Sequence, residues 1–210
     1  MPQQVETLEG TALHEAGHAV MAWFCDHIIG VVSIIPDYDD NSAGHVLSDD
    51  KGCNSLFEPF ELHPYPEAPG GWVVRLGETE ARPLTDNEQR CLELQEEIQV
   101  LPRAERCAMV YAAGEVVERI ANPGITEWPG AQDDWAKAAE HLDILASDEG
   151  IDVGQAKARV IDRSEALLKE PIVWAAVEAV ANALLEHEKM DGKAVVEVIR
   201  SAFQSDTSSE

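Results

Sequence analysis

The first 50 residues of this 210-residue chain contain no lysine or arginine, although the whole chain has 15 such residues. Together with 40 aspartates and glutamates, this gives a formal net charge of −25. A negative field of that size repels phosphate backbones, so we expect no nucleic-acid partner. The excess acid fits either a solubility feature or a preference of the protein for cationic or unfolded polypeptides.

Long apolar runs are also missing. No stretch of 18 apolar residues occurs, and the N-terminus carries no positive charge before its first apolar segment. We therefore expect neither a transmembrane helix nor a signal peptide, and a cytoplasmic protein without a membrane partner. The four cysteines, at positions 25, 53, 91 and 107, form no CxxC pair. They predict reduced thiols rather than a disulfide framework or a second zinc site.

Residues 14–18 read His-Glu-Ala-Gly-His, which is the most informative feature of the chain. On an α-helix, positions i and i+4 share a face, so His14 and His18 can direct their imidazoles to one zinc ion. Glu15 then lies beside the metal, where a carboxylate can take a proton from a water whose pKa zinc lowers to about 7. This HExxH pattern is typical of zinc metallopeptidases.

The flanks of the pentapeptide favour a buried helix over residues 11–25. They are strongly apolar, and Gly17 is the single helix breaker in that range. The alternative is that the two histidines and the glutamate satisfy one another by hydrogen bonds in a core helix. That arrangement costs several kcal/mol when such groups are buried without a metal or other partners.

Further along, residues 31–36 predict a short buried strand and residues 43–47 a second strand beside it. Residues 51–103 hold six of the eleven prolines and predict an irregular insertion, either a lid or partner surface or a passive excursion. Within it, residues 72–76 are a candidate strand. Thr85 and Glu88 form a capping-box signature for a helix that ends near residue 100.

The remainder of the chain predicts helices over residues 104–121 and 132–147 and an almost wholly helical segment from residue 153. Pro171 should kink or break that segment. Residues 190–192 predict a turn before the last helix at 193–203. We expect one domain over residues 1–204 and a disordered tail over 205–210.

A catalytic zinc site usually takes three protein ligands plus water, so another ligand must come from downstream. Asp134 is one candidate, because it falls on the apolar stripe of the helix at 132–147 and in its first turn. A capping or dipole role would also suit Asp134, and Asp133 could fill that role equally well. Glu118, on the inner stripe of the preceding helix, is the rival as ligand, ligand partner or half of an ion pair.

Several segments resemble the peptidase domain of the FtsH ATP-dependent zinc metalloproteases. In chain order they are residues 12–20 (ALHEAGHAV), 32–36 (VSIIP), 43–45 (AGH), 113–120 (AGEVVERI), 130–138 (GAQDDWAKA), 183–186 (ALLE) and 190–192 (MDG). The resemblance implies an aspartate third ligand, which falls on Asp134. It also implies a mainly helical α+β fold with a small sheet beside the zincin-type metal helix, a C-terminal helical bundle, and endopeptidase activity on unfolded chains.

The chain also departs from that family. No GxxxxGK[ST] phosphate loop and no membrane anchor occur in it, and aspartates replace the family's basic residues after position 36. We therefore expect an ATP-independent, stand-alone zinc peptidase acting on a polypeptide substrate, with a separate ATPase or regulatory partner as an option. Two alternatives stay open: a protease specific for one partner, and a zinc-binding adaptor or inhibitor without activity. The sequence does not indicate an oligomeric state.

Overall fold

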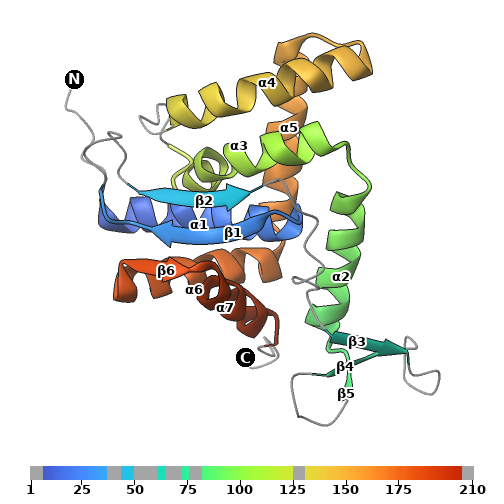
Figure 1. Cartoon of the computed structure of the whole chain (residues 1–210), viewed down its shortest axis with the longest axis vertical. Coiled ribbons are helices and arrows are strands. Elements are labelled where there is room, and N and C mark those ends of the chain that lie inside the picture. The colour runs from blue at the N-terminus through green and yellow to red at the C-terminus, as the bar shows by residue number, and fades with distance from the viewer. Residues whose placement is uncertain are drawn as a thin grey trace.

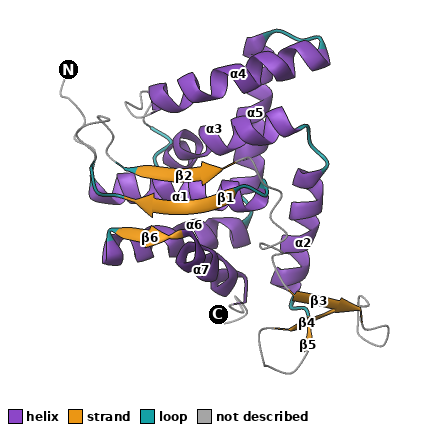
Figure 2. Ribbon diagram, viewed as in Figure 1, coloured by secondary structure: helices purple, strands orange, loops and turns teal. Residues whose placement is uncertain are grey.

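A computed structural model describes residues 7–36, 44–49, 61–64, 72–75, 82–124 and 131–204. Within these ranges the protein is mainly helical, with seven helices and two small antiparallel sheets (Figures 1 and 2). The helices are α1 (Leu8–Phe24), α2 (Asp86–Gln99), α3 (Arg103–Ala121), α4 (Ala131–Glu149), α5 (Val153–Leu168), α6 (Pro171–His187) and α7 (Gly192–Gln204). The strands are β1 (Ile28–Ser33), β2 (His45–Asp49), β3 (Glu61–Pro64), β4 (Trp72–Arg75), β5 (Arg82–Pro83) and β6 (Lys189–Asp191).

Helix α1 lies at the centre of the core. Its N-terminus is capped by Thr7, whose hydroxyl accepts a hydrogen bond from the Gly10 amide at 3.1 Å. From residue 15 to residue 24 every side chain is buried, because α3 and α6 pack against the helix and the β2-β1-β6 sheet covers it (Figure 1). A helix buried on all sides requires the almost uniformly apolar sequence that the flanks of the pentapeptide show.

Gly17 brings α1 and α3 close together. A Cβ atom at this position would lie 2.7 Å from Val117 Cγ2 and 3.0 Å from the Ala113 carbonyl oxygen, so a larger residue would separate the helices. The glycine inside the pentapeptide is therefore a packing residue. It places the histidine face of α1 directly against α3.

Strand β1 is the middle strand of the first sheet, with β2 and β6 antiparallel on either side. In this register Val32 is opposite Val46 on β2 and Met190 on β6. The turn predicted at 190–192 is therefore wrong for its first two residues, which pair with β1 as a short strand. Only at Gly192 does the chain enter α7, and a Cβ there would lie 1.6 Å from the Ile29 carbonyl oxygen.

Most predicted elements are confirmed, with shifted ends. The strand predicted at 31–36 begins three residues earlier and ends at Ser33, whose hydroxyl accepts a hydrogen bond from the Ile35 amide at 3.2 Å. The capping box is present, with Thr85 and Glu88 bonding each other's amides. Pro171 breaks the helix rather than kinking it, because it is the first residue of α6.

The insertion at 51–103 contains more order than its sequence predicts. Besides β4 and α2, it holds β3 and β5, which pair with β4 on either side in a second sheet. That sheet lies near the N-terminal end of α2, away from the first sheet (Figure 1). The predicted tail at 205–210 and Cys53 lie outside the described residues. The other three cysteines are buried, and none of them forms a disulfide within the described residues.

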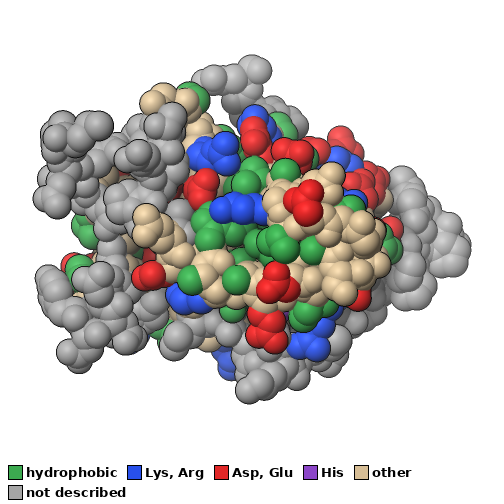
Figure 3. Space-filling view, turned by 90° about the horizontal axis from the view of Figure 1, so that it is seen from above, with side chains coloured by type: hydrophobic (Ala, Val, Ile, Leu, Met, Phe, Trp, Pro, Cys, Tyr) green, Lys and Arg blue, Asp and Glu red, His purple; other side chains and the backbone are tan. Residues whose placement is uncertain are grey.

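No described helix is both long and apolar enough to cross a membrane. On the face seen from above, acidic and basic side chains alternate around hydrophobic ones, so the described part of this face shows no single-sign patch (Figure 3). The first 50 residues nonetheless remain free of lysine and arginine.

Candidate metal centre

His14, His18 and Asp134 come together between α1 and the first turn of α4. The two histidine Nε2 atoms lie 3.0 Å apart, and Asp134 Oδ2 lies 3.1 Å from Nε2 of His14 and 3.2 Å from Nε2 of His18. Among the described residues, these three side chains are close enough together to hold one metal ion. Two potential donors four residues apart on one helix thus meet a third that follows 116 residues later.

The three donors fit a zinc ion. Zinc–ligand bonds of about 2.0–2.2 Å at tetrahedral angles separate neighbouring donor atoms by about 3.3–3.6 Å. The observed separations of 3.0–3.2 Å are slightly shorter, so a small opening of the side chains suffices. Two imidazoles and one carboxylate also match the donor set of catalytic zinc sites, which leave a fourth position for water.

Each histidine is oriented through its other ring nitrogen. His18 Nδ1 lies 2.7 Å from the Val110 carbonyl oxygen, and since a carbonyl only accepts, Nδ1 carries the proton and Nε2 offers its lone pair. His14 Nδ1 lies 3.3 Å from Glu118 Oε1. Glu118 therefore contacts the ring from the side opposite the donor cluster. Its other oxygen is buried without a partner.

Gly114 of α3 makes room for the donor cluster. A Cβ atom at this position would lie 2.5 Å from His14 Nε2 and 2.6 Å from His18 Nε2. Those are close to metal-ligand distances and far inside van der Waals contact, so a side chain here would occupy the space that the two nitrogens face. Residue 114 must therefore lack a side chain for the two imidazoles to lie as they do.

Glu15 lies beside the donors without joining them. The residue is 5% exposed, and His14 and His18 lie near it on the same helix. The main chain of Gly44, just before β2, closes over it: a Cβ there would lie 2.8 Å from Glu15 Oε1 and from the Ser33 carbonyl oxygen. Burial raises the pKa of Glu15, an effect that the neighbouring histidines partly offset.

The charges of the cluster are strongly coupled. Burial disfavours a charged His14, but the carboxylates of Asp134 and Glu118 outweigh it and raise the pKa of His14 to about 10. Burial likewise disfavours a charged Asp134, yet its hydrogen bonds to the histidines hold its pKa well below the usual range. Without a metal the site therefore keeps a proton on His14 at neutral pH, paired with a carboxylate.

The structure places all four sequence-derived site residues together. It puts Asp134 against both Nε2 atoms and leaves Asp133 exposed. Glu118 contacts the far nitrogen of His14 rather than the donor cluster. Sequence reasoning missed the Val110 carbonyl, which carries no residue-type signal, and the two glycines at 44 and 114. The AGE and AGH triplets inside the matching segments were the available hints for those glycines.

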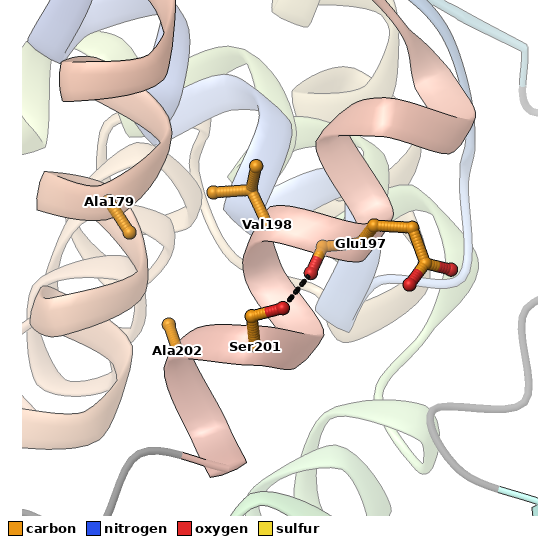
Figure 4. A pocket seen from close by; sticks show the side chains of 5 residues that line it. All are labelled: Ala179, Glu197, Val198, Ser201 and Ala202. Atoms are coloured by element: carbon orange, nitrogen blue, oxygen red, sulfur yellow. Dashed lines mark hydrogen bonds between the residues drawn. The ribbon is translucent and has the colours of Figure 1, made fainter. Parts of the chain in front are cut away.

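A shallow apolar groove between α6 and α7 is the other hollow of interest (Figure 4). It is lined by Ala179, Glu197, Val198, Ser201 and Ala202. The Ser201 hydroxyl donates to the Glu197 carbonyl oxygen at 2.8 Å, and the lining includes neither histidine nor cysteine. The groove therefore offers no cluster of metal-ligand side chains like that of His14, His18 and Asp134.

No protein-family model matches the chain, and no curated protein matches it at a significant level. The resemblance to the FtsH peptidase domain thus depends on the residue pattern alone.

Proposed function

We propose that the protein is a zinc-dependent endopeptidase of FtsH-like type that hydrolyses peptide bonds in unfolded or flexible polypeptides. One observation carries the proposal: three zinc-type donors, from segments far apart in the sequence, converge within 3.2 Å beside a buried glutamate that is not one of them. A structural zinc site needs four protein ligands and no such carboxylate.

The residues divide the chemistry between them. A zinc ion held by His14, His18 and Asp134 would lower the pKa of a bound water and polarise the scissile carbonyl. Glu15 accepts the proton that the water loses as its oxygen attacks the carbonyl carbon, and then delivers that proton to the amine when the C–N bond breaks. Its raised pKa suits both steps, since a buried carboxylate accepts a proton more readily than an exposed one. Glu118 and the Val110 carbonyl keep the imidazoles turned toward the ion.

The first sheet offers a place for the substrate. Within the described residues β2 pairs with β1 on one side only, so its other edge can bind an extended peptide through main-chain hydrogen bonds. Gly44 immediately precedes β2 and lies against Glu15. A peptide on that edge would therefore pass next to the proposed base. Such pairing needs an extended substrate, which supports unfolded chains or flexible termini as the substrate class.

The test is proteolysis by the zinc-loaded protein and its Glu15→Gln variant, with zinc content measured in the same samples. Glutamine keeps the shape of the side chain but cannot accept a proton. We expect cleavage of an unfolded casein-type substrate to fall by about 100-fold or more, the usual share of a general base, while zinc stays at one per chain. Glu9→Gln, an exposed change in the first turn of α1, is the matched control and should cleave normally.

Other outcomes would assign the protein differently. Normal turnover by zinc-replete Glu15→Gln would refute the mechanism. Zinc binding by the wild type without cleavage of any unfolded substrate would favour the adaptor or inhibitor alternative. Cleavage of a single protein would favour a partner-specific protease.

A further inference from the structure

We propose that Trp135 is a positioning residue for the third ligand: it locks the first turn of α4 to α3 and α5, so that Asp134 stands at bonding distance from the zinc ion. The inference depends on the proposed zinc site but not on peptidase activity. It assigns a role to a residue that is not a ligand itself and lies next to one in the sequence.

Two contacts from two different helices meet on this one side chain. The indole Nε1 of Trp135 donates a hydrogen bond to Glu115 Oε2 of α3 at 2.5 Å. On α5, Lys157 places its ammonium nitrogen 3.8 Å from the centre of the ring, within the range of a cation–π contact. Arg119 Nη1 lies 3.5 Å from Glu115 Oε1 and holds that carboxylate from the other side. Trp135 therefore joins three helices at the edge of the metal centre.

The position of Asp134 depends on how α4 is placed relative to α1. The two histidines belong to α1, which packs on α3, and α4 packs on α3 in turn. Asp134 lies in the first turn of α4, where a helix frays most easily. The hydrogen bond from Trp135 to Glu115 of α3 fixes how that turn is rotated and how far it lies along the axis of α4. Displacements of about 1 Å at a functional group are enough to impair it.

Packing alone is the alternative role, since the indole also packs against the hydrophobic core. Trp135→Phe separates the two roles, because phenylalanine keeps an aromatic ring and removes the N–H donor. If the indole only fills space, zinc affinity should change little. If it positions Asp134, zinc affinity should fall even when the metal-free protein remains folded.

Trp174→Phe is a matched control. Its indole Nε1 also donates to a glutamate, Glu178 Oε1 at 2.9 Å, but within α6 and four residues away. Both variants thus lose one indole–carboxylate hydrogen bond, and only one of the two bonds links α4 to α3. A difference in zinc affinity between the two variants is therefore due to where the lost hydrogen bond lies. It is not due to the replacement of tryptophan by phenylalanine as such.

The experiment is zinc titration in competition with a chelator, for the wild type and both variants. We expect the zinc Kd to rise about 10-fold or more in Trp135→Phe, as for other groups that orient ligands, and to stay within about 2-fold in Trp174→Phe. The visible spectrum of cobalt(II) bound in place of zinc should change in Trp135→Phe alone, because it reports coordination geometry. Glu115→Ala should reproduce the loss, and the double variant with Trp135→Phe should be no weaker than the worse single variant.

The outcomes separate the inference from the function. If the wild type binds zinc and Trp135→Phe and Glu115→Ala bind it equally well, Trp135 has no positioning role. If Trp135→Phe does not fold, Glu115→Ala alone decides, because it leaves the indole in the core. If the wild type itself binds no zinc, the proposed function is wrong and this inference falls with it, whereas loss of affinity in neither variant of a zinc-binding wild type overturns the inference alone.

Discussion

Replacing Gly114 by alanine tests whether the space between the two histidines belongs to a metal. The new Cβ would lie 2.5 Å from His14 Nε2 and 2.6 Å from His18 Nε2, about 1 Å inside normal contact. Without zinc the imidazoles can relieve the clash by weakening their contacts with the Val110 carbonyl and Glu118. With zinc bound they cannot, because both nitrogens must stay on the ion. The strain of overpacking, about 1–3 kcal/mol, should therefore fall mainly on the zinc-bound state.

At 1.4 kcal/mol per factor of ten, that strain weakens zinc binding by about 5- to 140-fold. Thermal stability of the metal-free protein is a poor readout, since alanine favours a helix over glycine by about 1 kcal/mol and offsets part of the strain. The assay is the zinc Kd by chelator competition. Gly124→Ala, with open space around its Cβ, is the control and should bind zinc like the wild type. Equal affinities for the two variants would refute the assignment of this space to a metal.

Three further predictions concern the ligands and their protons. Asp134→Ala should weaken zinc binding by more than the 10- to 100-fold typical of residues that hydrogen-bond to metal ligands, while Asp133→Ala leaves zinc affinity nearly intact. Tight zinc binding by Asp134→Ala would show that the third ligand lies elsewhere. Glu118→Gln should keep its zinc within about 100-fold and lose some stability, and complete loss of metal would make Glu118 a ligand. Because His14 holds a proton up to a pKa of about 10, zinc uptake should release about one proton near pH 8 and tighten about 10-fold per pH unit from pH 7 to 9. Calorimetry in buffers of different ionisation enthalpy measures that proton, and an affinity independent of pH would contradict the raised pKa.

The parts of the site that lie on one helix could be predicted from sequence, because helical spacing is a local property. The four-residue spacing of the histidines alone places them on one face, and the apolar stripe of α4 brings Asp134 inward with Ala138 and Leu145. The distance between α1 and α4 is not a local property. It follows from the close packing at Gly17 and Gly114, which only the structure shows.

The small strands were the hardest elements to predict. β6 has three residues and a sequence typical of a turn, and it becomes a strand because β1 offers it hydrogen bonds. β3 and β5 contain Pro64 and Pro83, which argue against a strand when read locally. Both are edge strands of their sheet, where a residue without an amide proton is tolerated. β3 and β5 pair with β4, their neighbour along the chain, whereas β6 pairs with β1, more than 150 residues before it.

The position of the metal tests the central claim most directly. Anomalous scattering measured at the zinc absorption edge, from crystals of the zinc-loaded protein, locates the ion without reference to activity. The account predicts one strong peak per chain, about 2.0–2.2 Å from His14 Nε2, His18 Nε2 and a carboxylate oxygen of Asp134, with Glu15 outside bonding distance. No peak between these three residues, or a peak bound by Glu15 or Glu118 in place of Asp134, would contradict it.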